Sequence, residues 1–154
     1  MKYFVFGTLT DNDILASLIG RIPNKYAAIL KGYCVYSGDA SSLSNEMKSD
    51  IGSKRDLSNF SFLFAKKSSA DDIISGDVVE ITEDEEKYFD KWERYPNWYQ
   101  KEKVIVSDLL GKEHEVYLYV QNIEGKPVKV FERIQGDKKS YVEAAKRLHE
   151  KLEC

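Results

Sequence analysis

Short apolar runs with a two-residue period recur along this chain, and they constrain its fold more than any other feature. Most runs have the length of a β-strand and are bounded by glycine or polar residues. They predict strands over residues 2–6, 26–37, 60–64, 75–81, 104–110 and 116–120. Apolar side chains at helical spacing predict helices over residues 11–20, 82–95 and 141–152. Because strands outnumber helices and several are joined by long or helical connections, we expect an α+β fold in which helices cover a curled sheet.

The composition is typical of one soluble globular domain spanning residues 1–154. Hydrophobic residues make up 42% and charged residues 32%, which is enough apolar material for a core and unlike a disordered chain. The net charge of −3 provides no strong field to attract nucleic acid or an anionic membrane. No apolar run reaches the roughly 18–20 residues of a membrane span, and the first run is too short for a signal peptide. We therefore expect a cytoplasmic protein with reduced Cys34 and Cys154, with a disulfide between them as the alternative.

Residues that carry the commonest enzyme chemistry are sparse. His114 and His149 are the two histidines, and neither has cysteine or acid neighbours at metal-ligand spacing. We interpret both as exposed structural residues and predict no metal site. The start of the chain also lacks the glycine spacing and lysine of a phosphate loop. Residues 38–58 are rich in Ser, Asp, Gly and Lys, which predicts a long surface loop without apolar anchors that either covers a pocket or moves freely.

A turn directly after the first strand is one of two segments with chemical potential. It reads Phe6-Gly7-Thr8-Leu9. A glycine at the end of a buried strand lets backbone N–H groups approach a ligand closely, as in a cradle for an oxyanion or a carboxylate. A purely structural turn is the commoner meaning of this pattern, so the turn does not decide the function by itself.

Residues 88–100 form the second segment and hold six aromatic side chains. Glu93 follows Phe89 by one helical turn and lies near the end of its helix, so it borders the apolar face. The helix dipole and the apolar neighbours both raise the pKa of a carboxyl placed there, towards the range useful for proton transfer. Asp90 either pairs with Glu93 or bonds to nearby backbone and solvent. The alternative, which the pattern alone favours, is an aromatic core stripe with a solvated edge at Glu93 and Arg94.

Taken together, the two segments resemble the gamma-glutamylcyclotransferase-like family, and within it the gamma-glutamylamine cyclotransferase branch. The family's first strand ends in Tyr-Gly-Ser/Thr-Leu, where this chain has the Phe-Gly-Thr-Leu turn. Its middle part carries Gly-x-Val, then Leu-Asp-x-x-Glu, a proline and Tyr-x-Arg. The similar residues here are Gly76-Asp77-Val78, Phe89-Asp90-Lys91-Trp92-Glu93, Pro96 and Tyr99-Gln100-Lys101. The resemblance covers the first ten residues and roughly residues 75–106.

The resemblance implies a small mixed β-barrel flanked by helices, with Glu93 as general acid/base and no cofactor. It implies that the backbone of the turn at residues 6–9 holds the γ-glutamyl end of a small-molecule substrate. A tyrosine on a later barrel strand lines the family's pocket, and Tyr119 or Tyr117 occupies that place in this chain. The activity implied is cyclisation of a γ-glutamyl amine or peptide to 5-oxoproline, with release of the amine.

Two departures from the family pattern leave alternatives open. Phe6 replaces the family tyrosine and removes a hydroxyl, which puts the choice of substrate in doubt. Lys101 replaces the arginine of Tyr-x-Arg, outside the presumed chemistry. One alternative function is a non-catalytic small-molecule binding module on the same scaffold. Another is a different acid/base reaction in the same pocket, such as removal of a γ-glutamyl protecting group.

Overall fold

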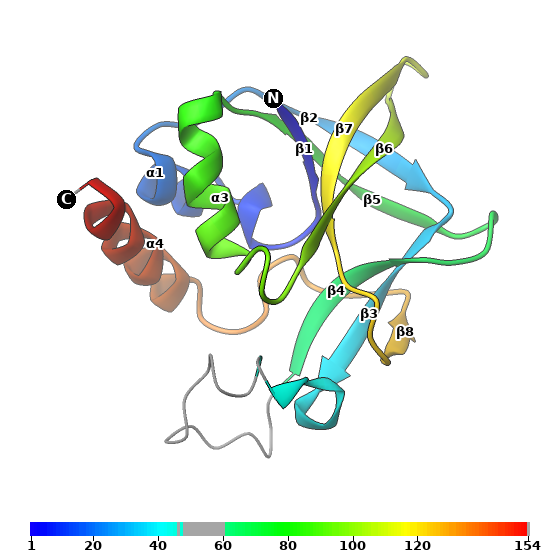
Figure 1. Ribbon diagram of the computed structural model, residues 1–154. Coiled ribbons are helices and arrows are strands. Elements are labelled where there is room, and N and C mark those ends of the chain that lie inside the picture. Colours follow the sequence, from blue (N-terminus) through cyan, green and yellow to red (C-terminus); the bar gives the residue numbers. More distant parts are fainter. Residues whose placement is uncertain (46, 48–60, 154) are drawn as a thin grey trace.

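The computed structural model describes residues 1–45, 47 and 61–153 (Figure 1). The strands are β1 (Lys2–Val5), β2 (Lys25–Lys31), β3 (Tyr33–Asp39), β4 (Ser61–Lys67), β5 (Ile73–Glu80), β6 (Gln100–Asp108), β7 (Glu113–Val120) and β8 (Lys126–Val128). The α-helices are α1 (Asn12–Ile19), α3 (Glu86–Trp92) and α4 (Lys138–Glu153). Short 3₁₀ turns lie at Thr8–Thr10, Ala40–Ser42 and Glu83–Glu85.

A closed five-stranded barrel forms the centre of the fold. Its strands follow the order β1-β5-β2-β6-β7, and β1 closes the barrel by pairing with β7. β1 is antiparallel to β5, with Tyr3 opposite Val79, and parallel to β7, with Tyr3 opposite Tyr117. β4, β3 and β8 continue the sheet beyond β7 as an arm (Figure 1). The expected α+β fold, a small mixed β-barrel flanked by helices, is confirmed.

Alternation along β1 and β7 places these strands between two apolar clusters. Phe4 and Leu118 pack inside the barrel, whereas Tyr3, Val5 and Tyr119 pack on the side of the helices. All five side chains are at most 5% exposed. Because both faces of β1 are covered, its sequence is a continuous apolar run rather than an alternating one.

Local signals in the sequence set the starts of the helices. The side chain of Asp11 accepts hydrogen bonds from the first turn of α1, and Gly20 ends that helix with a φ of 85°. The predicted capping box between Thr82 and Glu85 is present at the start of the segment that leads into α3. α1, α3 and α4 gather on one side of the barrel (Figure 1), where their apolar faces share one cluster with β1.

Some predicted strands differ from the observed ones. The single strand expected over 26–37 is wrong, because Gly32 adopts a φ of 85° and divides it into β2 in the barrel and β3 in the arm. The strand expected over 104–110 stops two residues early, and Leu109 and Leu110 lie in a turn with 77% and 95% exposure. β8 has no counterpart among the predictions, because three residues carry too little pattern.

The loop expected over residues 38–58 is only partly a loop. Its first residues finish β3, and a 3₁₀ turn follows at Ala40–Ser42. Leu43 and Met47 are 6% and 3% exposed, so the expectation that this segment lacks apolar anchors is wrong. Residues 46 and 48–60 lie outside the described residues, and with them Phe60, the expected start of the strand described as β4.

The helix that carries the candidate acid ends three residues before Tyr95. α3 stops at Trp92, Glu93 follows as its capping residue, and Arg94 adopts a φ of 55°. This left-handed residue ends the helix before Tyr95, the last helical residue that the sequence predicts. Glu93 is therefore at the very end of α3, where its side chain leaves the helix.

Candidate active site

A hollow of about 200 Å³ opens where the end of β1, the end of α3 and the middle of the barrel meet. Its walls come from β1 and the following turn, α3, β4, β7 and the segment between β8 and α4. Six of the residues that the sequence places in the substrate site line this hollow: Phe6, Gly7, Thr8, Leu9, Glu93 and Tyr119. Residues from opposite halves of the sequence thus meet at one place.

Glu93 stands in the wall of the hollow without a polar partner for its side chain among the described residues. Its backbone N–H bonds to the carbonyl of Phe89 at 2.9 Å, so the side chain continues the helix face that Phe89 begins. The side chain is half-buried, and no described residue donates a hydrogen bond to its carboxylate. Burial raises the pKa of Glu93 to about 7, because the carboxylate loses hydration and gains no cation. A carboxyl with this pKa can take up and release a proton at neutral pH.

The turn after β1 lines the same hollow and carries backbone N–H groups without a partner in the described chain. Within the described chain, the N–H groups of Gly7, Thr8 and Leu9 have no acceptor. Thr10 bonds to the Gly7 carbonyl through its N–H at 3.0 Å and its Oγ1 at 2.7 Å. Since the carbonyl of residue 7 and the N–H of residue 8 point in opposite directions across a planar peptide, these bonds turn the Thr8 N–H away from Thr10. The turn therefore holds free donors in a fixed orientation.

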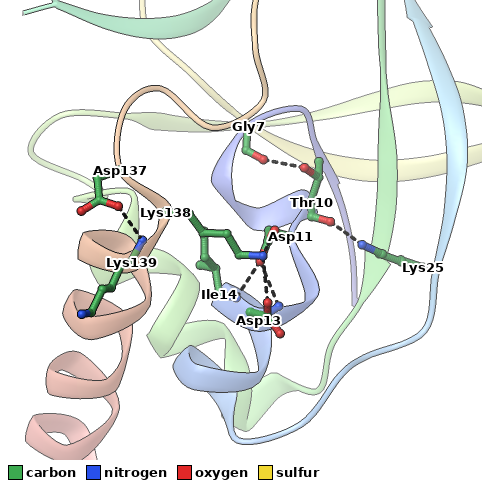
Figure 2. Close-up of polar contacts among 9 residues, drawn as sticks. All are labelled: Gly7, Thr10, Asp11, Asp13, Ile14, Lys25, Asp137, Lys138 and Lys139. Atoms are coloured by element: carbon green, nitrogen blue, oxygen red, sulfur yellow. Dashed lines mark hydrogen bonds and ion pairs between the residues drawn. The ribbon is translucent and has the colours of Figure 1, made fainter.

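Polar contacts with three neighbouring elements anchor this turn (Figure 2). Lys25, at the start of β2, donates a hydrogen bond to the Thr10 carbonyl. Lys138, at the start of α4, lies 3.1 Å from the carboxylate of Asp11 and 2.8 Å from that of Asp13. The turn is thereby tied to β2, α1 and α4, which limits its freedom to move relative to the hollow.

A hydrogen bond joins the end of α3 directly to the turn. Trp92 Nε1 donates to Thr8 Oγ1 at 2.9 Å. Trp92 immediately precedes Glu93, and its ring packs against Tyr141 of α4 with ring centroids 6.3 Å apart. The turn and the end of α3 are thus linked by one bond between residues 84 positions apart in the sequence.

Asp90 has a different role from Glu93. Its Oδ1 accepts a hydrogen bond from the Tyr119 hydroxyl at 2.7 Å and lies 2.9 Å from Lys101 Nζ. Asp90 therefore does not pair with Glu93, and its partners are the side chains of Tyr119 and Lys101 rather than the expected backbone or solvent. The structure also distinguishes the two candidate tyrosines. Tyr119 lines the hollow, whereas Tyr117 is not among the described residues that line it.

Lys101 lies closer to the site than the sequence analysis expects. It stands opposite Tyr119 in the β6–β7 ladder, and its side chain is 14% exposed. Its Nζ contacts Glu86 at 3.0 Å and Asp90 at 2.9 Å, and it lies 4.3 Å from the centre of the Tyr95 ring. One cation thus holds two carboxylates of α3 against the barrel strand that faces them.

Replacement of Lys101 with methionine is expected to destabilise the fold by about 2 kcal/mol, because Glu86 and Asp90 would lose their shared cation in a poorly hydrated place. Lys101→Arg should retain most of the stability. Lys103→Met is the matched control, since Lys103 is 61% exposed and 3.9 Å from Glu115, and should change little. Urea unfolding measures all three, and equal effects of the two methionine variants would contradict this role.

Ten further residues line the hollow, and the sequence assigned none of them a role in the site: Phe4, Val5, Phe62, Leu63, Trp92, Tyr99, Leu118, Arg133, Gln135 and Tyr141. Tyr99 donates a hydrogen bond from its hydroxyl to the Leu63 carbonyl at 2.9 Å. Its place in the family-like Tyr-x-Lys segment was the one available signal. Arg133 and Gln135 belong to an irregular segment, which carries no periodicity from which a wall could be recognised.

The histidines and Cys34 have structural environments. His114 pairs with Asp108 at 2.9 Å, and His149 Nδ1 lies 2.8 Å from the Leu18 carbonyl. Both are half-buried, so the prediction that they are exposed is wrong. Cys34 is a free thiol, and Cys154 lies outside the described residues. Among the described residues, no group of three His, Cys, Asp or Glu side chains is arranged to hold a metal ion, and none of the helices is long and apolar enough to cross a membrane.

The comparison with protein families decides to which one this chain belongs. The family model described as "Gamma-glutamyl cyclotransferase, AIG2-like" matches residues 3–138. The chain belongs to this family. The matched region includes β1, the following turn, Glu93 and the barrel strands, and so contains most of the hollow. No curated protein matches the sequence.

Solved structures share the fold of this gamma-glutamyl cyclotransferase family member at low sequence identity. A structure named gamma-glutamyl cyclotransferase is 16% identical with a TM-score of 0.64, and the match covers 99% of this chain and 86% of the other. An uncharacterized Homo sapiens protein is 16% identical with a TM-score of 0.61, and the match covers 99% of this chain and 86% of that protein. An Arabidopsis thaliana protein is 18% identical with a TM-score of 0.55, and the match covers 99% of this chain and 79% of that protein. At these identities the likeness establishes the fold alone.

Proposed function

We propose that this protein is a cyclotransferase that converts γ-glutamyl amines or peptides to 5-oxoproline, with Glu93 as its acid/base. The observation that supports the proposal is the meeting of Glu93 with the free amides of residues 7–9 in one hollow. The reaction needs one group that moves protons near neutral pH and donors for a developing oxyanion. Both are available there, on a scaffold of the matching family.

The reaction proceeds within one substrate molecule. The Glu93 carboxylate takes a proton from the substrate's α-ammonium, and the free amine attacks the γ-carbonyl carbon. Folding of the substrate in the hollow supplies much of the rate, because nucleophile and carbonyl belong to the same molecule. The developing oxyanion accepts hydrogen bonds from the turn amides, each worth about 3 kcal/mol when well placed. Protonated Glu93 then gives its proton to the leaving nitrogen, and the C–N bond breaks. The Glu93 carboxylate takes the second proton that the attacking nitrogen must lose to become the amide of 5-oxoproline. It passes this proton to the released amine, which leaves as its ammonium ion.

Within the family we favour γ-glutamyl amines as substrates, in line with the resemblance to the gamma-glutamylamine cyclotransferase branch. The test is product analysis with the wild-type protein on a panel of γ-glutamyl amines, γ-glutamyl amino acids and glutathione. We expect 5-oxoproline and the free amine in equal amounts. Glutamate in place of 5-oxoproline would instead indicate hydrolysis in the same pocket, as for removal of a γ-glutamyl protecting group, and would contradict cyclisation.

A non-catalytic binding module is the second candidate, and Phe6 is the observation that favours it. Phe6 lines the hollow without the hydroxyl of the family tyrosine, and its ring packs edge-on against Phe131 with centroids 6.0 Å apart. If that hydroxyl were essential for turnover, the hollow would still bind a γ-glutamyl compound. Binding of panel members by calorimetry with no product from any of them would support this candidate over the enzyme.

The pH dependence of kcat/KM is expected to follow the pKa of Glu93. Activity should fall as the pH drops below about 7, because protonated Glu93 cannot accept the ammonium proton, whereas an ordinary carboxyl would place this limb near pH 4. An initial-rate profile of 5-oxoproline release from pH 4 to 9 measures the limb. An acid limb near pH 4 would contradict the role of a buried carboxyl.

The same group makes a matching prediction for stability. The pKa of Glu93 in the folded state lies above that of an unfolded chain, so its contribution to stability is fully present below the unfolded pKa and is lost as the pH rises through about 7. Glu93→Gln removes this titration. The fall in unfolding free energy between pH 5 and 8, measured with urea, should therefore be smaller in the variant than in the wild type.

A further inference from the structure

Arg133 carries the one basic side chain among the described residues that line the hollow, and Glu93 carries the one acidic side chain. A γ-glutamyl substrate brings a second negative charge of its own, the α-carboxylate beside the attacking amine. Two carboxylates in one poorly hydrated hollow repel each other unless a cation or several donors stabilise the second. The charge pattern of the walls therefore points to Arg133 as the partner of the substrate's carboxylate.

The backbone of Arg133 lies beside the turn that holds the reacting end. A Cβ atom built on Gly7 would be 3.6 Å from the Arg133 carbonyl oxygen, so residues 7 and 133 are in near contact. The guanidinium is fixed on the same side, because its Nη1 lies 2.9 Å from the carboxylate of Asp77. Asp77 stands opposite Val5 in the β1–β5 ladder, and Val5 is two residues before Gly7. Both ends of Arg133 are thus placed next to the end of β1.

The guanidinium has donors to spare. The bond to Asp77 uses one of its five N–H groups, and no other described residue accepts a hydrogen bond from it. Its side chain is 45% exposed, so an incoming ligand can reach the remaining donors. The planar fork of an arginine matches a carboxylate with two parallel hydrogen bonds. Asp77 orients this fork and leaves its other edge open.

We propose that Arg133 binds the α-carboxylate of the γ-glutamyl group and thereby selects γ-glutamyl compounds over amides that lack this carboxylate. The proposal rests on the proposed function for the identity of the substrate. It assigns separate tasks to three parts of the hollow: the turn amides bind the oxyanion, Glu93 moves the proton, and Arg133 holds the carboxylate. The identity of the leaving amine does not affect this selectivity.

A matched pair of substrates tests this assignment. γ-Glutamyl-methylamide and 4-amino-N-methylbutanamide differ by the α-carboxylate alone and cyclise to 5-oxoproline and 2-pyrrolidinone, respectively. In the wild type, kcat/KM should be roughly 10- to 100-fold higher for the first compound. Arg133→Gln should lower kcat/KM for the first by a similar factor, chiefly through KM, and leave the second unchanged. Equal losses on both compounds, or no loss on either, would overturn the proposal.

Two control variants separate charge recognition from damage to the fold. Asp77→Asn removes the ion pair but keeps the guanidinium, so preference for the carboxylate should largely remain. Arg147→Gln removes an exposed arginine of α4 and should have no effect. Loss of the preference in Arg147→Gln, or its complete loss in Asp77→Asn with an intact Arg133, would assign the selectivity elsewhere.

Binding measurements make the test independent of turnover. 5-Oxoproline and 2-pyrrolidinone again differ by the carboxylate, and calorimetry should show tighter binding of 5-oxoproline to the wild type and to Glu93→Gln. Arg133→Gln should abolish that difference. If no γ-glutamyl compound is turned over but this difference is present, the proposed function fails while the role of Arg133 stands. If the wild type binds the two ligands equally, the role of Arg133 is refuted whatever the activity.

Discussion

Replacing Glu93 with glutamine is expected to lower the kcat for 5-oxoproline release by about 1000-fold while the protein stays folded. Glutamine has nearly the same shape but neither takes up nor gives a proton, so both proton transfers would lose their carrier. No described residue bonds to the Glu93 carboxylate, and no structural interaction is therefore lost. Measurement of 5-oxoproline and free amine by chromatography, together with the urea unfolding curve, separates the loss of chemistry from unfolding.

Glu83→Gln is the matched control for this experiment. It makes the same chemical change ten residues earlier, on an exposed side chain of the 3₁₀ turn that precedes α3. We expect wild-type kcat and KM from it. Undiminished product release by the Glu93 variant would remove Glu93 from the mechanism. A loss of activity in both variants to the same extent would indicate a general electrostatic effect instead.

Substitution of alanine for Gly76 is expected to destabilise the fold by about 3 kcal/mol or more. Gly76 lies in β5, and a Cβ atom there would be 2.4 Å from the Val5 carbonyl oxygen and 2.8 Å from Cζ of Phe4. A backbone oxygen cannot move aside as the end of a flexible side chain can. β1 would have to shift away from β5, which breaks the closure of the barrel. The free energy of unfolding in urea measures this change.

Ser75→Ala is the control for Gly76, because it leaves a methyl group as the side chain of the exposed residue next to Gly76 in the same strand. It should alter the unfolding free energy by less than about 0.5 kcal/mol. Because the Val5 carbonyl immediately precedes the turn at residues 6–9, any folded Gly76→Ala protein should also lose activity. An unchanged unfolding midpoint in Gly76→Ala would contradict the close approach of β1 and β5.

The sequence predicts most of the elements but not how they pair. Period-two runs identify β4, β5 and β7, and a continuous apolar run identifies β1, since each strand has at least one face against an apolar cluster. The pattern over 26–37 did not reveal the break at Gly32, because a single left-handed residue leaves the apolar spacing on both sides intact. β8 was missed for the opposite reason, because its three residues are held by pairing with β3 rather than by their own burial.

What the sequence by itself determined is the chemistry of single positions: the capping box at Thr82, the exposed donors after a buried strand, and an acid one turn beyond Phe89 on an aromatic helix. These depend on neighbours within a few residues, which local patterns encode. Only the tertiary structure decided that Glu93 has no side-chain partner among the described residues while Asp90 has two. It also decided that Tyr119 rather than Tyr117 lines the hollow, and that Arg133 belongs to it. Those outcomes depend on barrel closure between β1 and β7, a contact between residues more than a hundred positions apart, and no local pattern records which side chains such a closure brings together.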